Sequence, residues 1–253
     1  MSKQKTLLVI GAHMDDCETG AGGVIFKAVD LGLRVVLVNT IGDYSNRAEM
    51  AGADLQAERQ RVIDLAAGMG AEKILLNYKY HQYPDSLESR KEMAGLVADV
   101  RPDVAIIHHW DDYWADHRVT GLVARDALLF ASGLLEGRED VPMVKSIYAF
   151  VAGQNQSYGF EPDTYVDVTP YIDRIARIRY ELDRVMSPSV PEDKWFRQHT
   201  RIFHPTDPSL NREMDLTAHA EAQLAKLRQY GAKSGALYAE PYLAVFKRTT
   251  ELW

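Results

Sequence analysis

The sequence predicts an α/β fold of three layers, in which a mostly parallel β-sheet is flanked by helices on both faces. Short, continuously apolar runs, typical of strands buried on both faces, alternate with longer stretches of helical periodicity. The chain has 253 residues, of which 46% are hydrophobic, and this is enough to bury the core of one large domain. We therefore expect a single domain over residues 1–253.

The predicted elements follow in order along the first half of the chain. The apolar runs that predict strands are 6–11, 34–40, 73–77 and 104–109. The stretches that predict helices are 20–31, 54–69, 87–100 and about 117–135. Glycines at 68 and 70 provide a stop signal for the second helix. Strands and helices that alternate in this way predict right-handed crossovers and a layered sheet.

The pattern loosens after a fifth apolar run at 144–150. A strand that turns into a helix is expected around Pro170, and a last helix at about 216–230 leads into the final apolar stretch, 235–246. Residues 186–215 hold four prolines and little periodicity. We expect them to form an irregular, lid-like segment of the single domain.

Composition restricts the class of protein. The formal net charge of −7 argues against a nucleic-acid binder, which needs a basic face. One cysteine excludes an internal disulfide framework and suits a reducing compartment. No apolar run has the length of a membrane span or the form of a signal peptide. We expect a cytoplasmic protein that binds neither nucleic acid nor membrane.

A first polar cluster, His13, Asp15 and Asp16, directly follows the first predicted strand. In open parallel sheets, ligands bind outside the carboxyl ends of strands. Imidazole and carboxylate suit a divalent metal such as zinc, and a second carboxylate beside it can accept a proton from water. Two alternatives stay open: an aspartate that only caps the next helix, and a nucleotide loop, although the glycines at 20–23 do not have G-x-G-x-x-G spacing.

A second polar cluster, "HHWDDYWADHRVTG" at 108–121, follows the fourth predicted strand. If the first and fourth strands are neighbours, His117 completes a site of two histidines and one carboxylate with His13 and Asp16. Such a site leaves a position open for water. Asp116 or Asp112 can then orient a ligand imidazole from behind. The alternative is a solvated surface loop.

Together these clusters resemble the LmbE/PIG-L family of metal-dependent de-N-acetylases. The segment "AHMDDCETGAGG" at 12–23 is similar to the A-H-P-D-D motif of the family, and "WADH" at 114–117 to its H-x-D-H motif. Further similarity lies in "NTIGD" at 39–43, "ERQRVIDLAAGMG" at 58–70 and "GALYAE" at 235–240. The resemblance implies an LmbE-type, Rossmann-like fold.

The resemblance also implies a reaction and the residues that perform it. One divalent cation per chain, Zn²⁺ or else Fe²⁺, would be held by His13, Asp16 and His117, with Asp15 as the general base. The substrate implied is a small N-acylated amine, of the N-acetylglucosamine type, whose amide is hydrolysed. Relatives often form rings, so a homo-oligomer is expected as well.

One departure bears on activity. Trp114 stands where the family has the first histidine of H-x-D-H, which stabilises the oxyanion, and an indole N–H cannot transfer a proton. Candidates to replace that histidine are His81, His108 and His109. The residues expected to face substrate are Arg59, Asp43, Trp114 and His109. The alternative to an active deacetylase is a catalytically impaired relative that binds metal or carbohydrate; a Rossmann-type nucleotide binder is a further one.

Overall fold

The structure is a computed structural model that describes residues 4–152, 157–188 and 224–247. Its strands are β1 (Thr6–Gly11), β2 (Arg34–Asp43), β3 (Glu72–Lys79), β4 (Val104–His108), β5 (Ser146–Phe150), β6 (Thr164–Asp167) and β7 (Ala239–Lys247). Its labelled helices are α1 (Asp16–Asp30), α2 (Leu55–Met69), α3 (Leu87–Val100), α4 (Ala115–Leu134) and α5 (Ile172–Met186).

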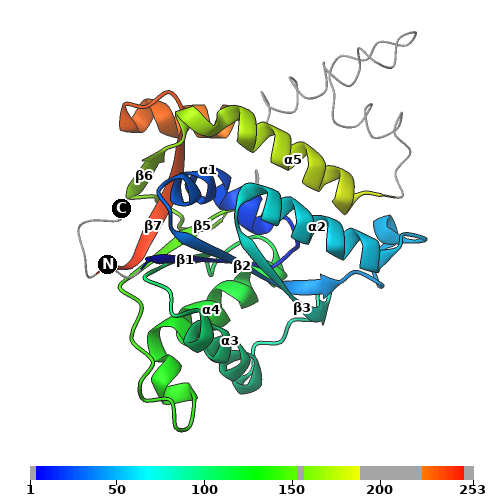
Figure 1. Cartoon of the computed structure of the whole chain (residues 1–253), viewed down its shortest axis with the longest axis vertical. Helices are drawn as coiled ribbons and strands as arrows, with labels where there is room; N and C mark the ends of the chain where they lie inside the picture. Colours follow the sequence, from blue (N-terminus) through cyan, green and yellow to red (C-terminus); the bar gives the residue numbers. More distant parts are fainter. Residues whose placement is uncertain (1–3, 153–156, 189–223, 248–253) are drawn as a thin grey trace.

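The strands form one seven-stranded sheet in the order β3-β2-β1-β4-β5-β7-β6. The strands from β3 to β5 are parallel, whereas β7 runs antiparallel to both β5 and β6. Helices α1, α2 and α5 cover one face of the sheet, and α3 and α4 cover the other (Figure 1). The predicted three-layer α/β fold with a mostly parallel sheet is confirmed.

Burial follows strand position. Every residue of β1 and β4 is buried, as their continuous apolar runs predict for central strands. The prediction that 73–77 is buried on both faces is wrong, because β3 lies at the end of the strand order and its residues are half-buried or exposed. One contiguous cluster of buried apolar side chains draws on residues from Leu7 to Tyr242.

The order of the strands creates the crevice for a site. The chain leaves β1 toward β2 and β3 on one side, and leaves β4 toward β5 on the other. Strands β1 and β4 are parallel neighbours in register, with Ile10 opposite Ile107. The loops after these two strands therefore diverge from a topological switch point, where open α/β sheets bind their ligands.

Helix α1 begins earlier than predicted, at residue 16 rather than 20, and is interrupted at Ala21 (φ −139°, ψ 24°). The glycines therefore lie inside the helix instead of opening it. A Cβ on Gly20 would lie 2.0 Å from the Phe150 ring, and one on Gly23 would lie 2.3 Å from Val168. These two glycines allow the helix to pack closely against its neighbours, whereas Gly22 has room for a methyl group.

Capping residues delimit the following helices close to the predicted bounds. Asp54 accepts hydrogen bonds from the first turn of α2, and Gly70 ends that helix with a positive φ of 89°, as its stop signal predicts. Ser86 caps α3 in the same way. Helix α4 also lies within two residues of its predicted bounds.

The C-terminal half is described in part. Strand β6 and helix α5 flank Pro170 as predicted. Residues 224–234 are helical, within and just beyond the helix predicted at 216–230. The predicted lid-like segment lies outside the described residues except for 186–188. In the described ranges, no helix combines the length and the apolar character that a membrane span needs.

Candidate metal centre and its pocket

Three side chains from the two crevice loops converge on one point. The distance from His13 Nδ1 to His117 Nε2 is 3.1 Å, and Asp16 Oδ2 lies 3.4 Å from the first atom and 3.3 Å from the second. All three residues are buried. The structure thus brings together the three ligands expected from the sequence, in a group that could hold a metal ion.

The shape of this triangle fits a tetrahedral cation. Bonds of about 2.0–2.1 Å to zinc place two ligand atoms of a tetrahedron about 3.3–3.4 Å apart. The three observed distances, 3.1, 3.3 and 3.4 Å, lie close to those of one face of such a tetrahedron. Three protein ligands are the number found in catalytic zinc sites, whereas structural zinc sites have four.

The electrostatics of the site also fit a cation. Burial lowers the pKa of both imidazoles, but the carboxylates outweigh it: Asp16 and Asp116 raise the pKa of His13 to about 9, and Asp16 and Asp112 raise that of His117 to about 10. Protonating both rings would set two N–H groups against each other across 3.1 Å. A metal cation between the two rings would instead accept a lone pair from each imidazole nitrogen and would balance the negative charge of the nearby aspartates.

Each proposed ligand is held from behind by a second polar group. His13 Nε2 lies 3.0 Å from Asp116, and His117 Nδ1 lies 3.2 Å from Asp112. Both aspartates named from the sequence as orienting groups therefore contact a ligand imidazole. His108 Nε2 lies 3.0 Å from Asp16 Oδ2.

Two further contacts define the inner wall of this centre. Burial and the charge of His117 lower the pKa of His108 to about 4, so His108 is neutral and donates to Asp16. The His108 and His117 rings stack with centroids 4.0 Å apart. His108, Asp112 and His117 form a second group within metal-ligand distance, but His108 and Asp112 do not line the pocket.

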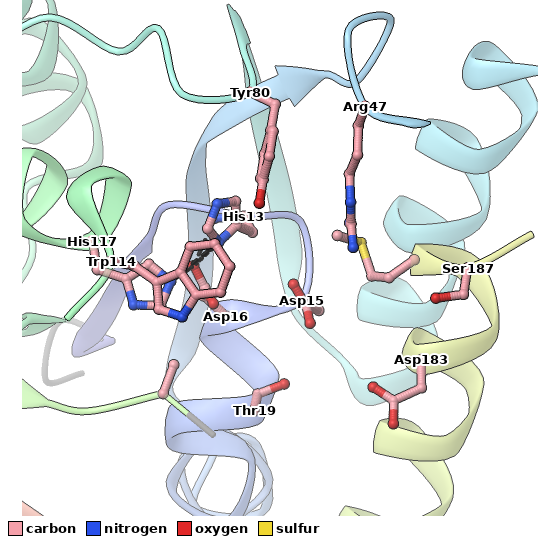
Figure 2. A pocket seen from close by; sticks show the side chains of 12 residues that line it. His13, Asp15, Asp16, Thr19, Arg47, Tyr80, Trp114, His117, Asp183 and Ser187 are labelled. Carbon is pink, nitrogen blue, oxygen red and sulfur yellow. Dashed lines mark hydrogen bonds and ion pairs between the residues drawn. The ribbon is translucent and has the colours of Figure 1, made fainter. Parts of the chain in front are cut away.

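The candidate centre opens into a cavity of about 280 Å³. Figure 2 shows the side chains around it. The lining residues are His13, Asp15, Asp16, Thr19, Arg47, Tyr80, Trp114, His117, Ala152, Asp183, Met186 and Ser187. Asp15 faces this space beside the triangle, and its burial and the adjacent Asp16 carboxylate raise its pKa. A carboxylate with a raised pKa is suited to accept a proton.

A buried ion pair supports the loop that carries His13 and Asp15. Lys73 Nζ lies 2.7 and 2.9 Å from the two Glu18 oxygens and donates to the Met14 carbonyl at 2.6 Å. The side chains of Lys73 and Glu18 are fully buried. The edge strand β3 therefore holds the loop of the candidate centre through one lysine.

Among the residues expected to face substrate, only Trp114 lines the pocket. The Arg59 guanidinium instead donates to the carbonyls of Gly42, Leu75 and Leu76, which tie α2 to β2 and β3. Asp43 accepts from the Ser45 amide and closes a turn. We therefore do not carry Arg59 and Asp43 forward as substrate contacts.

The three histidines considered as substitutes at the Trp114 position occupy different places. His109 bonds to Ser157 Oγ at 2.6 Å, away from the pocket, so it too is set aside as a substrate contact. His108 is buried against Asp16. His81 instead stacks on Trp114 (6.0 Å, 11°) and bonds through Nδ1 and its amide to Asp116. Of the three, His81 alone adjoins the aromatic wall of the pocket.

Several lining residues were not expected from the sequence. Arg47 and Tyr80 follow the carboxyl ends of β2 and β3. Ligands bind outside the carboxyl ends of parallel strands, so these two residues could have been named from the sequence for the same reason as those after β1 and β4. Asp183 lies on α5 and reaches the pocket through the packing of that helix, for which no local signal exists.

Several known proteins are similar to this chain in sequence. Residues 8–128 match the family described as PIG-L, GlcNAc-PI de-N-acetylase. The chain is 29% identical over 206 residues to the diacetylchitobiose deacetylase of Thermococcus kodakarensis, a match that covers 76% of this chain and 72% of that protein. It is 24% identical over 259 residues to the 4-oxalmesaconate hydratase of Pseudomonas putida, covering 98% and 92%.

A solved structure shares the fold. The N,N'-diacetylchitobiose deacetylase from Pyrococcus horikoshii, complexed with its inhibitor MPG, superposes with a TM-score of 0.70 and 23% sequence identity. The match covers 95% of this chain and 84% of that chain. Both the sequence and the fold are therefore similar to those of deacetylases.

Proposed function

Because the chain carries a PIG-L family domain over residues 8–128, and its relatives include deacetylases, we propose that it is a metal-dependent hydrolase of N-acetyl amides. The substrate is an N-acetylated amino sugar or a related small amine. The observation that carries the proposal is the triangle of His13, Asp16 and His117, with the Asp15 carboxylate beside it in one pocket.

The three residues of the triangle would hold one divalent cation. Two imidazole nitrogens and one carboxylate oxygen suit Zn²⁺, and they also accept Fe²⁺. The bound cation would supply Lewis acidity toward the acyl carbonyl and the attacking water. Asp116, Asp112 and His108 keep the ligand atoms in place through the contacts described above.

Asp15 moves the proton in this proposal. It takes a proton from water as the water oxygen bonds to the acyl carbon. It then returns that proton to the amine nitrogen as the carbon–nitrogen bond breaks, which yields acetate and a free amine. Its raised pKa supports this role, because a general acid–base group can both accept and release a proton most readily when its pKa is close to the working pH.

The pocket walls support a small, partly polar substrate. Trp114 and Tyr80 present aromatic rings, on which a sugar ring can stack, and a volume of about 280 Å³ suits a single ring with its substituents.

The single cysteine, Cys17, is a free, buried thiol, which supports our expectation of a cytoplasmic location.

Two other functions remain to be separated from this one. The relative from Pseudomonas putida is a hydratase, so addition of water to a double bond is the second candidate reaction. An inactive relative that only binds metal or carbohydrate is the other, because Trp114 lacks a transferable proton.

A metal analysis combined with a substrate panel tests the proposal. We expect close to one divalent ion per purified chain and release of acetate from at least one N-acetylated amino sugar. Metal without acetate release, together with hydration of an unsaturated dicarboxylate, would favour the hydratase. Metal without either reaction would favour the inactive relative, and absence of metal would overturn the proposal.

A further inference from the structure

One cation stands in the wall of the proposed active-site pocket. Arg47, in the loop that follows β2, is the single lysine or arginine among the lining residues that the structure describes. Three aspartates line the same cavity, Asp15, Asp16 and Asp183. Figure 2 shows Arg47 on the side of the pocket opposite Trp114 and His117.

Aromatic rings position this guanidinium. Its central carbon lies 5.4 Å from the centroid of the Tyr80 ring and 5.9 Å from that of the Tyr44 ring. Tyr44 is buried, and its hydroxyl accepts a hydrogen bond from the Met14 amide at 3.1 Å. The cation therefore rests on a rigid surface that is itself joined to the loop of the candidate metal centre.

The hydrogen bonds of Arg47 leave its outer nitrogens available. Nε lies 3.3 Å from Glu49, whose side chain is 53% exposed. Within the described ranges, Nη1 and Nη2 donate to no protein acceptor. Two adjacent guanidinium nitrogens without a protein partner match the two oxygens of a carboxylate or phosphate.

Tyr80 links this cation to the proposed reaction centre. The His13 ring lies 5.3 Å from the same Tyr80 ring, measured between centroids. Figure 2 shows the Tyr80 ring between Arg47 and His13, and all three residues line one cavity. A small molecule in this cavity can place its amide at the triangle and an anionic group at Arg47.

We propose that Arg47 binds an anionic oxygen group, a carboxylate or a phosphate, on the substrate, so that the substrate class is N-acylated amines that carry such a group. This inference rests on the proposed function for the position of the amide. A neutral amino sugar lacks the partner that Arg47 offers, and it is the poorer substrate.

Matched substrates test this specificity. We would compare kcat/KM for acetate release from N-acetylglucosamine, N-acetylmuramic acid and N-acetylglucosamine 6-phosphate, which separates a neutral sugar from a carboxylate and a phosphate. The wild-type protein is expected to prefer one of the anionic substrates at least tenfold. Arg47→Gln should reduce that preference about 10- to 100-fold, mainly through KM, because a charged hydrogen-bond partner is lost.

Two control variants test whether the preference for anionic substrates depends on the guanidinium group of Arg47. Arg47→Lys keeps the charge but not the two-nitrogen geometry, and is expected to keep only part of the preference. Arg61→Gln removes an arginine from α2 that pairs with Glu181 outside this pocket, and should leave the preference unchanged. A preference that survives in Arg47→Gln, or a wild-type preference for the neutral sugar, would overturn the inference.

A binding measurement separates this inference from the proposed function. Calorimetry with metal-loaded Asp15→Asn protein would compare the same three compounds, with and without the additional Arg47→Gln change. If the wild-type protein hydrolyses none of the compounds, but the anionic ones bind to Asp15→Asn protein and lose affinity on Arg47→Gln, the deacetylase proposal fails and the anion site stands. If acetate is released but anionic and neutral compounds bind alike, the anion site fails alone.

Discussion

His13 Nδ1 and His117 Nε2 lie 3.1 Å apart, although 104 positions separate the two residues in the sequence. The contact exists because β1 and β4 are neighbours at the switch point of the sheet, so that the loops after both strands open into one crevice. Asp116 and Asp112 hold the opposite edges of the two rings.

Removing a ligand and removing the base should have different effects. His117→Ala is expected to lower the metal content well below one ion per chain. Asp15→Asn should keep the metal and reduce turnover by about 10²–10⁴-fold, the usual contribution of a general base. Elemental analysis and an acetate assay on both variants check this. Full activity in Asp15→Asn would remove Asp15 from the mechanism.

Binding of the cation should release protons. The pKa of about 9 for His13 and about 10 for His117 means that the cation-free protein holds at least one proton on this pair of rings at pH 8, whereas metal ligands are unprotonated. We expect release of at least one and at most about two protons per ion. Because protons compete with the metal, affinity should rise with pH toward 9. Calorimetry in buffers of different ionisation enthalpy measures this, and a release of zero would contradict it.

Trp114→His places an imidazole where an uncharged indole now stands. We expect metal affinity close to that of the wild type, because position 114 contributes no ligand to the triangle, and higher turnover on acetylated amino sugars, because imidazole can donate a proton to the reacting group. Trp114→Phe is the control, since it keeps an aromatic ring against His81. If Trp114→His loses metal or unfolds, Trp114 is a structural anchor instead.

Replacing only one member of the buried Glu18–Lys73 ion pair should strongly lower the free energy of unfolding. Lys73→Met leaves the Glu18 carboxylate buried without its cation and is expected to lower the free energy of unfolding by about 3–5 kcal/mol. The double variant with Glu18→Gln should recover most of that loss. Urea denaturation gives these values.

A matched control is an exposed ion pair that involves Glu72, the residue before Lys73. Arg34 and Glu72 form an ion pair whose side chains are 39% and 57% exposed, so Arg34→Met should cost no more than about 1 kcal/mol. Equal costs for Lys73→Met and Arg34→Met would show that burial does not set the contribution of the Glu18–Lys73 pair.

Replacing two neighbouring glycines of α1 by alanine should change the stability of the protein in opposite directions. Gly23→Ala forces a methyl group against Val168 and should destabilise the protein by about 1–3 kcal/mol, as overpacking does. Gly22→Ala has space and should stabilise it by about 0.5–1 kcal/mol through the unfolded chain. Thermal and urea unfolding of both variants test the packing of α1, and a stabilising Gly23→Ala would contradict it.

The candidate ligands could be named from the sequence because their signal is local. His13, Asp15 and Asp16 follow an apolar strand directly, and His117 follows another within ten residues. Parallel strands bring their carboxyl ends to one edge, so residue type and position after a strand marked these residues as candidates. The pairing of β1 with β4 had to be assumed, and the structure supplies it.

Alternation of apolar runs and helical periods thus determined the layers of the fold and the chemistry offered at the sheet edge. Tertiary structure alone decided that Arg59 binds backbone carbonyls while Arg47 faces the pocket, and that Asp183 reaches it from α5. The physical reason is that periodicity reports which side of an element is buried, whereas the partner of a polar side chain depends on elements brought near by the strand order. Edge position likewise left β3 half-exposed despite its apolar run.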